Sequence, residues 1–284
     1  MKKVNAPRCE LGEGPLWRSE SKEFFFIDIT RGQLYAWCPA TPHKAAKLVF
    51  QCREPLGAAL LATNGDLVLF AGPRVLLCPY GGSSTDCTLL WQLPLAPGER
   101  FNDAICDPYG RIFAGTKTET NEDGALWLLT PGRAPKRVLR GLAISNGMGF
   151  SPDNKVFYHT DSGLRTIFSY QYDPNTAAIT AAQPVVRLTS PDGAVPDGMT
   201  VDATGNLWAA CWGGGCVQQF SPAGKPLRTF ALPAVQTSSV AFGGTGLCDL
   251  LVTSAATGLN GTQDGGIFLL SPGASGRVEF RARL

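Results

Sequence analysis

Strand-like runs recur at nearly constant spacing along this chain, and this repeat restricts the possible folds more than any other feature. Each run is rich in β-branched and aromatic residues and follows a turn signal such as Asn64-Gly65-Asp66 or Thr204-Gly205-Asn206. The runs start about 43 to 51 residues apart, a period typical of propeller blades. They are residues 23–29, 66–70, 111–115, 155–159, 206–210 and 249–253.

A second strand-like segment precedes each run, so the repeating unit contains more than one strand. Six such pairs in 284 residues leave about 47 residues per unit, enough for four short strands. One unit alone cannot cover its apolar faces, so the units must close into a ring. The sequence predicts an all-β fold: residues 1–284 form a single domain, a six-bladed β-propeller of four-stranded antiparallel blades around a central channel. We expect residues 3–6 to close the ring as an outer strand beside residues 276–284.

Charge and hydropathy exclude several classes of partner. The formal net charge is only +2, and the basic residues are scattered rather than clustered, which argues against nucleic acid or an acidic membrane. No segment approaches the roughly 18 apolar residues that span a bilayer. Residues 1–7 lack the apolar core of a signal peptide. We therefore expect a cytoplasmic protein with no nucleic-acid, membrane or protein partner.

The nine cysteines are odd in number, irregularly spaced and without a Cys-x-x-Cys pair. A zinc ribbon or a redox pair needs tighter spacing. Together with the missing export signal, this predicts free thiols that pack as small buried hydrophobes. Cys211, beside Trp212 and a glycine run, is the cysteine we expect nearest to a functional surface.

Four segments place a carboxylate or amide beside Gly or Pro at the start of an apolar run. The first strand of a propeller blade lines the channel, so side chains that begin these strands converge at one mouth. Each segment alone is better explained as a turn, but the matching phase of all four favours a common site. The four are Gly12-Glu13-Gly14-Pro15, Phe101-Asn102-Asp103-Ala104, Ser145-Asn146-Gly147-Met148 and Pro196-Asp197-Gly198-Met199.

The scarcity of histidine directs the chemistry toward oxygen ligands. Only His43 and His159 are present: we expect His43 in a solvent-facing loop and His159 in a strand, bonded to a neighbour. Nucleophile-elbow, phosphate-loop and dinucleotide motifs are all missing. Oxygen atoms of Glu13, Asn146 and Asp197 suit a divalent cation with open positions for water or substrate.

Three further side chains extend this predicted site. Arg100 and Asn102 form a donor pair for hydroxyl or carbonyl oxygens. We expect Asp103 to orient these neighbours by hydrogen bonds without itself contacting the metal or the substrate.

The motifs, taken in order, resemble the gluconolactonase, regucalcin and senescence-marker-protein family. The resemblance covers about residues 9 to 270 and rests on segments that occur at family-like separations. They are residues 11–17, 100–103, 107–116, 144–147 and 196–199, and residues 151–162 and 205–214 resemble the bacterial sugar-lactonase branch.

This resemblance implies a catalytic divalent metal at the channel mouth, held by Glu13, Asn146 and Asp197. It also implies hydrolysis of a sugar 1,4- or 1,5-lactone, a small-molecule partner, to the aldonic acid. The metal would polarise the carbonyl, Asp197 would activate water as general acid/base, and Arg100 and Asn102 would contact substrate. Ca²⁺ or Zn²⁺ is the expected cofactor, and Mg²⁺ or Mn²⁺ also fits the ligand set.

The chain departs from the family pattern in the region that contacts substrate. Ala104 replaces a glycine of animal members, and Thr120 occupies the position of a substrate-contacting glutamate, with Glu119 beside it as the candidate. The loop 117–124 is also shorter, and such rim loops set which sugar is accepted.

Two alternatives to a sugar lactonase stay open. One is a related six-bladed hydrolase of phosphotriesters or other esters. The other is a non-catalytic propeller that binds a cation, a ligand or a protein.

Overall fold

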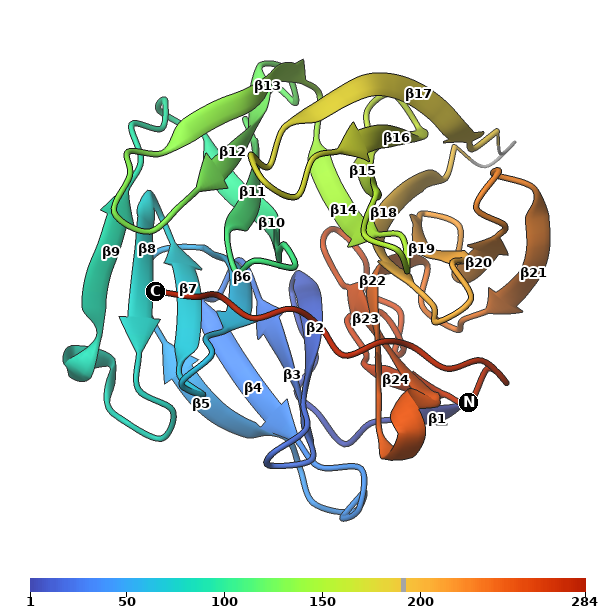
Figure 1. Ribbon diagram of the computed structural model, residues 1–284. Helices are drawn as coiled ribbons and strands as arrows, with labels where there is room; N and C mark the ends of the chain where they lie inside the picture. Colours follow the sequence, from blue (N-terminus) through green and yellow to red (C-terminus); the bar gives the residue numbers. More distant parts are fainter. Residues whose placement is uncertain (190–192) are drawn as a thin grey trace.

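The chain folds into six four-stranded antiparallel sheets arranged as blades around a ring (Figure 1). This architecture comes from a computed structural model that describes residues 1–189 and 193–284. It confirms the six-bladed β-propeller predicted from the repeat. Within the described residues, no helix is long and apolar enough to cross a membrane.

Each blade follows the chain from its innermost to its outermost strand. The first three blades are β2 (Gly12–Arg18), β3 (Glu23–Asp28), β4 (Gln33–Trp37) and β5 (Lys47–Gln51); β6 (Leu56–Leu61), β7 (Leu67–Ala71), β8 (Arg74–Cys78) and β9 (Thr88–Gln92); and β10 (Arg100–Cys106), β11 (Ile112–Lys117), β12 (Gly124–Leu129) and β13 (Lys136–Leu142). The next two are β14 (Ser145–Phe150), β15 (Val156–Asp161), β16 (Thr166–Tyr172) and β17 (Ile179–Arg187); and β18 (Val195–Val201), β19 (Leu207–Trp212), β20 (Cys216–Phe220) and β21 (Pro226–Ala231). The sixth is β22 (Gln236–Gly243), β23 (Asp249–Ala255), β24 (Phe268–Leu270) and β1 (Lys2–Lys3), and the 3₁₀ turns are η1 (Ser84–Asp86) and η2 (Thr245–Leu247).

The N-terminal strand closes the ring, but beside a different partner from the one we predicted. β1 pairs antiparallel with β24, with Lys2 opposite Leu269, and not with residues 276–284. The chain leaves the sheet after β24 because Pro272 has no N–H for a ladder and Gly273 takes a φ of 70°. An outer strand at the N-terminus is thus confirmed, at Lys2–Lys3 instead of residues 3–6, and its expected neighbour is wrong.

Aromatic side chains fill the wedges between neighbouring blades. Phe70 of β7 meets Phe101 of β10 edge to face at 5.0 Å between ring centroids, and Trp208 of β19 meets Phe242 of β22 at 5.5 Å. Such contacts stabilise beyond the burial of area alone. Each blade therefore completes the core of the next, which is why the ring must close.

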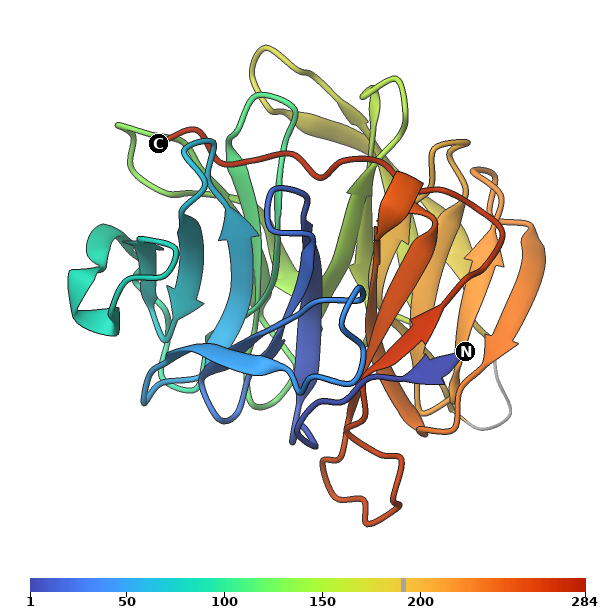
Figure 2. The same cartoon turned by 90° about the horizontal axis from the view of Figure 1, so that it is seen from below.

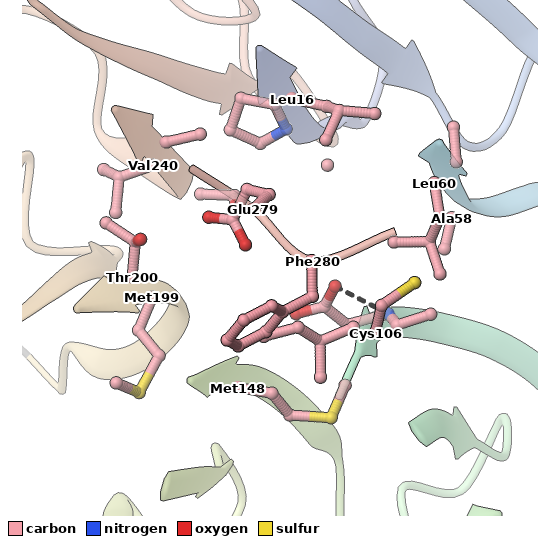
Figure 3. Close-up of a pocket in the computed structure, with 18 residues that line it drawn as sticks. Leu16, Ala58, Leu60, Cys106, Met148, Met199, Thr200, Val240, Glu279 and Phe280 are labelled. Atoms are coloured by element: carbon pink, nitrogen blue, oxygen red, sulfur yellow. Dashed lines mark hydrogen bonds between the residues drawn. The ribbon is translucent and has the colours of Figure 1, made fainter. Parts of the chain in front are cut away.

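The C-terminal residues 271–284 cross one face of the ring instead of joining a blade (Figures 1 and 2). Backbone hydrogen bonds attach this segment where innermost strands end: Ala282 N–H donates to Leu61 O at 2.9 Å. Figure 3 shows Glu279 and Phe280 among channel-lining residues such as Met148 and Met199. They border a cavity of about 60 Å³, so this segment closes one mouth of the channel.

One cysteine prediction is wrong. Cys78 of β8 and Cys87, just before β9, form a disulfide across the turn that contains η1. Sequence spacing did not indicate it, because the pairing depends on the register of the hairpin, which brings the two Cα atoms to 4.2 Å. The other seven cysteines are free thiols, but only four of them are buried as predicted; Cys38 and Cys52 are partly exposed and Cys248 is exposed.

We predict that replacing Glu279 by Gln raises thermal stability in a pH-dependent way. Burial raises the pKa of Glu279 to about 7, although Arg277 opposes this, and Asp103 and Cys106 line the same cavity. A raised carboxyl pKa favours folding below the unfolded-state pKa, and this contribution is lost as pH rises through the folded-state pKa. The Gln variant should therefore melt on the order of 2 °C above wild type near pH 8, with the gap shrinking toward about pH 5.

Melting curves followed by circular dichroism measure this difference. The exposed Glu122→Gln serves as a control that should show no such trend. A gap that stays constant from acid to alkaline pH would contradict the prediction.

Candidate metal and substrate site

The innermost strand of every blade carries a register irregularity near its start. In β2 the shift lies between Glu13 and Leu16, in β14 between Asn146 and Met148, and in β18 between Pro196 and Met199. β6, β10 and β22 have the same feature. Bulges re-aim side chains next to them, so the ring directs the first residues of several strands toward one end of the channel.

Glycines next to the site residues allow the innermost strands to approach closely. A Cβ on Gly147 would lie 2.5 Å from the carbonyl oxygen of Asp197. A Cβ on Gly198 would lie 2.1 Å from Oγ of Ser239. These glycines are required by packing between blades, and they fix the backbone on which Asn146 and Asp197 stand.

The polar groups predicted to converge do meet, in a cavity of about 270 Å³. This cavity lies at the starts of the innermost strands, whereas the C-terminal segment contacts their ends. Five predicted site residues line it: Glu13, Arg100, Asn102, Asn146 and Asp197. Its other lining residues are Leu11, Ile29, Lys117, Asn121, Ile144, Ser162, Val195 and Trp212.

The three candidate metal ligands are buried and come from three different blades. Glu13, Asn146 and Asp197 expose 7%, 5% and 5% of their surfaces. Asn146 Nδ2 donates to Ser162 Oγ at 3.0 Å, and Ser162 Oγ in turn donates to the carbonyl of Pro196 at 2.7 Å. This chain of bonds orients the Asn146 amide and ties β14 to β18.

Oxygen atoms of this trio lack partners. Among residues 1–189 and 193–284, Oδ1 of Asn146 and Oδ1 of Asp197 are buried without a hydrogen bond. Burial raises the pKa of both Glu13 and Asp197, and the Asp197 charge raises that of Glu13 further. Buried unpaired carboxylates are costly, and a hard divalent cation would satisfy these oxygens. The donor set therefore fits such a cation.

Arg100 and Asn102 form a fixed pair beside the trio. Arg100 Nη1 donates to Asn102 Oδ1 and to the carbonyl of Phe101, both at 2.8 Å. Asn102 Nδ2 donates to the carbonyl of Ser145 at 3.0 Å, which anchors the pair to the next blade. The remaining N–H groups of Arg100 form no hydrogen bond within residues 1–189 and 193–284, so they can donate to a ligand in the cavity.

Glu119 and Asp103 are the predicted site residues that the structure does not bring to this cavity. Glu119 lies in the loop after β11. It is exposed, and its carboxyl group lies against Gly98. Two other residues of this region, Lys117 and Asn121, line the cavity instead. Asp103 lines the smaller channel cavity and accepts a hydrogen bond from Ala104 N–H at 2.7 Å.

Both histidines lie as the sequence indicated. His43 is exposed, and His159 is fully buried with Nε2 2.8 Å from Ser145 Oγ. Burial lowers the pKa of His159 to about 3, so this ring is neutral. Cys211 is buried next to Trp212, which lines the site cavity.

Sequence reasoning missed Ser162, Lys117 and Trp212. Lys117 directly follows the Gly115-Thr116 pair of a recognised motif, which was an available signal. Ser162 ends the recognised segment 151–162, but its role was not predicted, because its contact with Asn146 depends on the register between β14 and β15.

Comparison with known proteins finds relatives along nearly the whole chain. The family model described as SMP-30/Gluconolactonase/LRE-like region matches residues 11–256. Pentonolactonase XacC of Haloferax volcanii is 35% identical over 284 residues, covering 96% of this chain and 95% of that protein. Human regucalcin is 33% identical over 278 residues, covering 93% and 91%.

Solved structures share the same fold. A calcium-binding protein, regucalcin, from Agrobacterium tumefaciens superposes with a TM-score of 0.90 at 24% identity, covering all of both chains. Together with the match of the family model to most of the chain, these similarities establish that the protein belongs to the SMP-30/gluconolactonase/LRE-like family.

Proposed function

We propose that the protein hydrolyses sugar lactones, aldono-1,4- or 1,5-lactones, to the aldonic acids with the help of one divalent cation. The observation that carries this proposal is the buried trio with unpartnered oxygens beside the fixed Arg100–Asn102 donor pair. A relative named pentonolactonase, 35% identical over nearly the whole chain, supports the substrate class.

Glu13, Asn146 and Asp197 would hold the cation, which supplies a Lewis acid for the lactone carbonyl when bound. Oxygen-only donors suit Ca²⁺ well, and Zn²⁺, Mg²⁺ or Mn²⁺ also accept carboxylate oxygen.

The residues of the chain account for proton transfer and for substrate orientation. Asp197 has a buried oxygen without a hydrogen bond, so it can take a proton from the attacking water. As the new C–O bond forms and the ring C–O bond breaks, this proton passes to the departing ring oxygen. Arg100 and Asn102 orient the sugar through its hydroxyl oxygens.

The first prediction from this proposed function concerns metal dependence. In a pH-stat assay on a panel of aldonolactones, at least one lactone should be hydrolysed, and chelation should lower its rate at least about tenfold because the Lewis acid is lost. Adding back Ca²⁺, Zn²⁺, Mg²⁺ or Mn²⁺ separately should restore the rate and identify the best cation. Failure of every lactone to react faster than in protein-free buffer would refute the proposed function.

The second prediction concerns Asp197. Asp197→Asn removes the proton acceptor and one anionic ligand, so kcat should fall by about 10² or more. The melting temperature of the variant should not fall, because burial, the largest influence on the wild-type carboxylate, disfavours its charge more than Lys117 and Arg100 favour it.

Asp86→Asn is the matched control for this change. Asp86 is exposed in the turn with η1 and does not line the site cavity, so its replacement should leave kcat unchanged. Near-wild-type kcat in a folded Asp197→Asn protein would show that Asp197 is not the general base.

A further inference from the structure

Lys117 is a cationic side chain in the site cavity that the proposed reaction does not yet use. It ends β11 and lines the cavity beside Arg100. Its side-chain nitrogen forms no hydrogen bond or ion pair with residues 1–189 or 193–284. Lysines are rarely withdrawn from solvent without a partner, so this ammonium group is available to a ligand.

Arg100 lies directly opposite Lys117 in the ladder between β10 and β11. Like charges opposite each other on neighbouring strands destabilise a sheet. Burial, followed by the repulsion from Arg100, lowers the pKa of Lys117. An anionic group bound between these two side chains would relieve their repulsion.

The charge balance of the cavity also favours an anionic ligand. Its charged lining residues, within the described parts of the chain, are Glu13, Asp197, Arg100 and Lys117. The two carboxylates balance the two cationic side chains, so a divalent cation on the trio leaves an excess of positive charge. A neutral sugar lactone does not compensate this excess, whereas an anionic one does.

We propose that the cavity prefers lactones that carry a free carboxylate at the far end of the sugar, and that Lys117 and Arg100 bind this carboxylate. The inference rests on the proposed lactonase function and names its substrate class, the monolactones of aldaric acids. The free edge of a guanidinium binds a planar carboxylate through parallel hydrogen bonds, and the ammonium adds a point charge. Both cationic groups and the ligand trio face one cavity of about 270 Å³, within reach of a single sugar.

The test compares kcat/KM for charged and neutral lactones on the metal-loaded protein. D-glucaro-1,4-lactone and D-galactaro-1,4-lactone carry a carboxylate, whereas D-glucono-1,5-lactone and L-arabinono-1,4-lactone do not. Wild type should prefer the charged pair at least about tenfold, and Lys117→Met should reduce this preference at least about tenfold. Lys117→Arg keeps the charge and should retain most of the preference.

A binding measurement provides a readout independent of turnover. Calorimetric titration with D-glucarate and with D-gluconate should give tighter binding of the dianion to wild type, and Lys117→Met should remove the difference. Lys136→Met removes an exposed lysine from the outer strand β13, so it should change neither result.

The outcomes separate this inference from the function on which it rests. If no lactone is hydrolysed, the proposed function itself fails. If neutral lactones react and charged ones are not preferred, the lactonase function stands and the carboxylate preference is overturned. A preference for 6-phosphoglucono-1,5-lactone over the aldarolactones would likewise overturn the assignment to a carboxylate.

Discussion

The close approach of the innermost strands around the channel is the constraint on which the rest of this structure depends. A side chain at Gly147 or Gly198 would collide with the next blade, so both positions must stay glycine. The bulges beside them turn Asn146 and Asp197 toward one mouth of the channel. Packing and site geometry therefore have a common origin. The glycines that let the blades pack closely are the sequence neighbours of Asn146 and Asp197, so they also fix the backbone of these candidate metal ligands.

The closed ring also keeps two carboxylates buried, an arrangement that lowers the stability of the fold. Glu13 and Asp197 are buried carboxylates whose pKa values are raised by burial, a pattern more typical of functional sites than of stable cores. Further along the channel, Asp103 has a pKa raised to about 7 by burial and by Glu279. The aromatic contacts between blades supply the stability that tolerates these charges.

The sequence predicted those parts of the molecule that repeat locally. Turn signals and strand-like runs were enough to predict six blades. The matching position of polar residues in the repeat was enough to predict that one site contains Glu13, Arg100, Asn102, Asn146 and Asp197, which line one cavity. What it could not predict depends on register between strands. The bond from Asn146 to Ser162, the Cys78–Cys87 disulfide and the pairing of β1 with β24 all require knowing which residues lie opposite.

Loop conformation was the second feature that could not be predicted from the sequence, as the region after β11 illustrates. Glu119 and Asn121 are two residues apart, yet only Asn121 lines the cavity. Lys117 occupies the boundary between this loop and the blade. Thr116, one residue earlier, is fully buried and donates to the Glu99 carboxylate at 2.6 Å. A substitution at position 116 therefore disturbs the blade, whereas one at 117 changes the charge of the cavity wall, which leaves substrate preference free to vary without altering the ring.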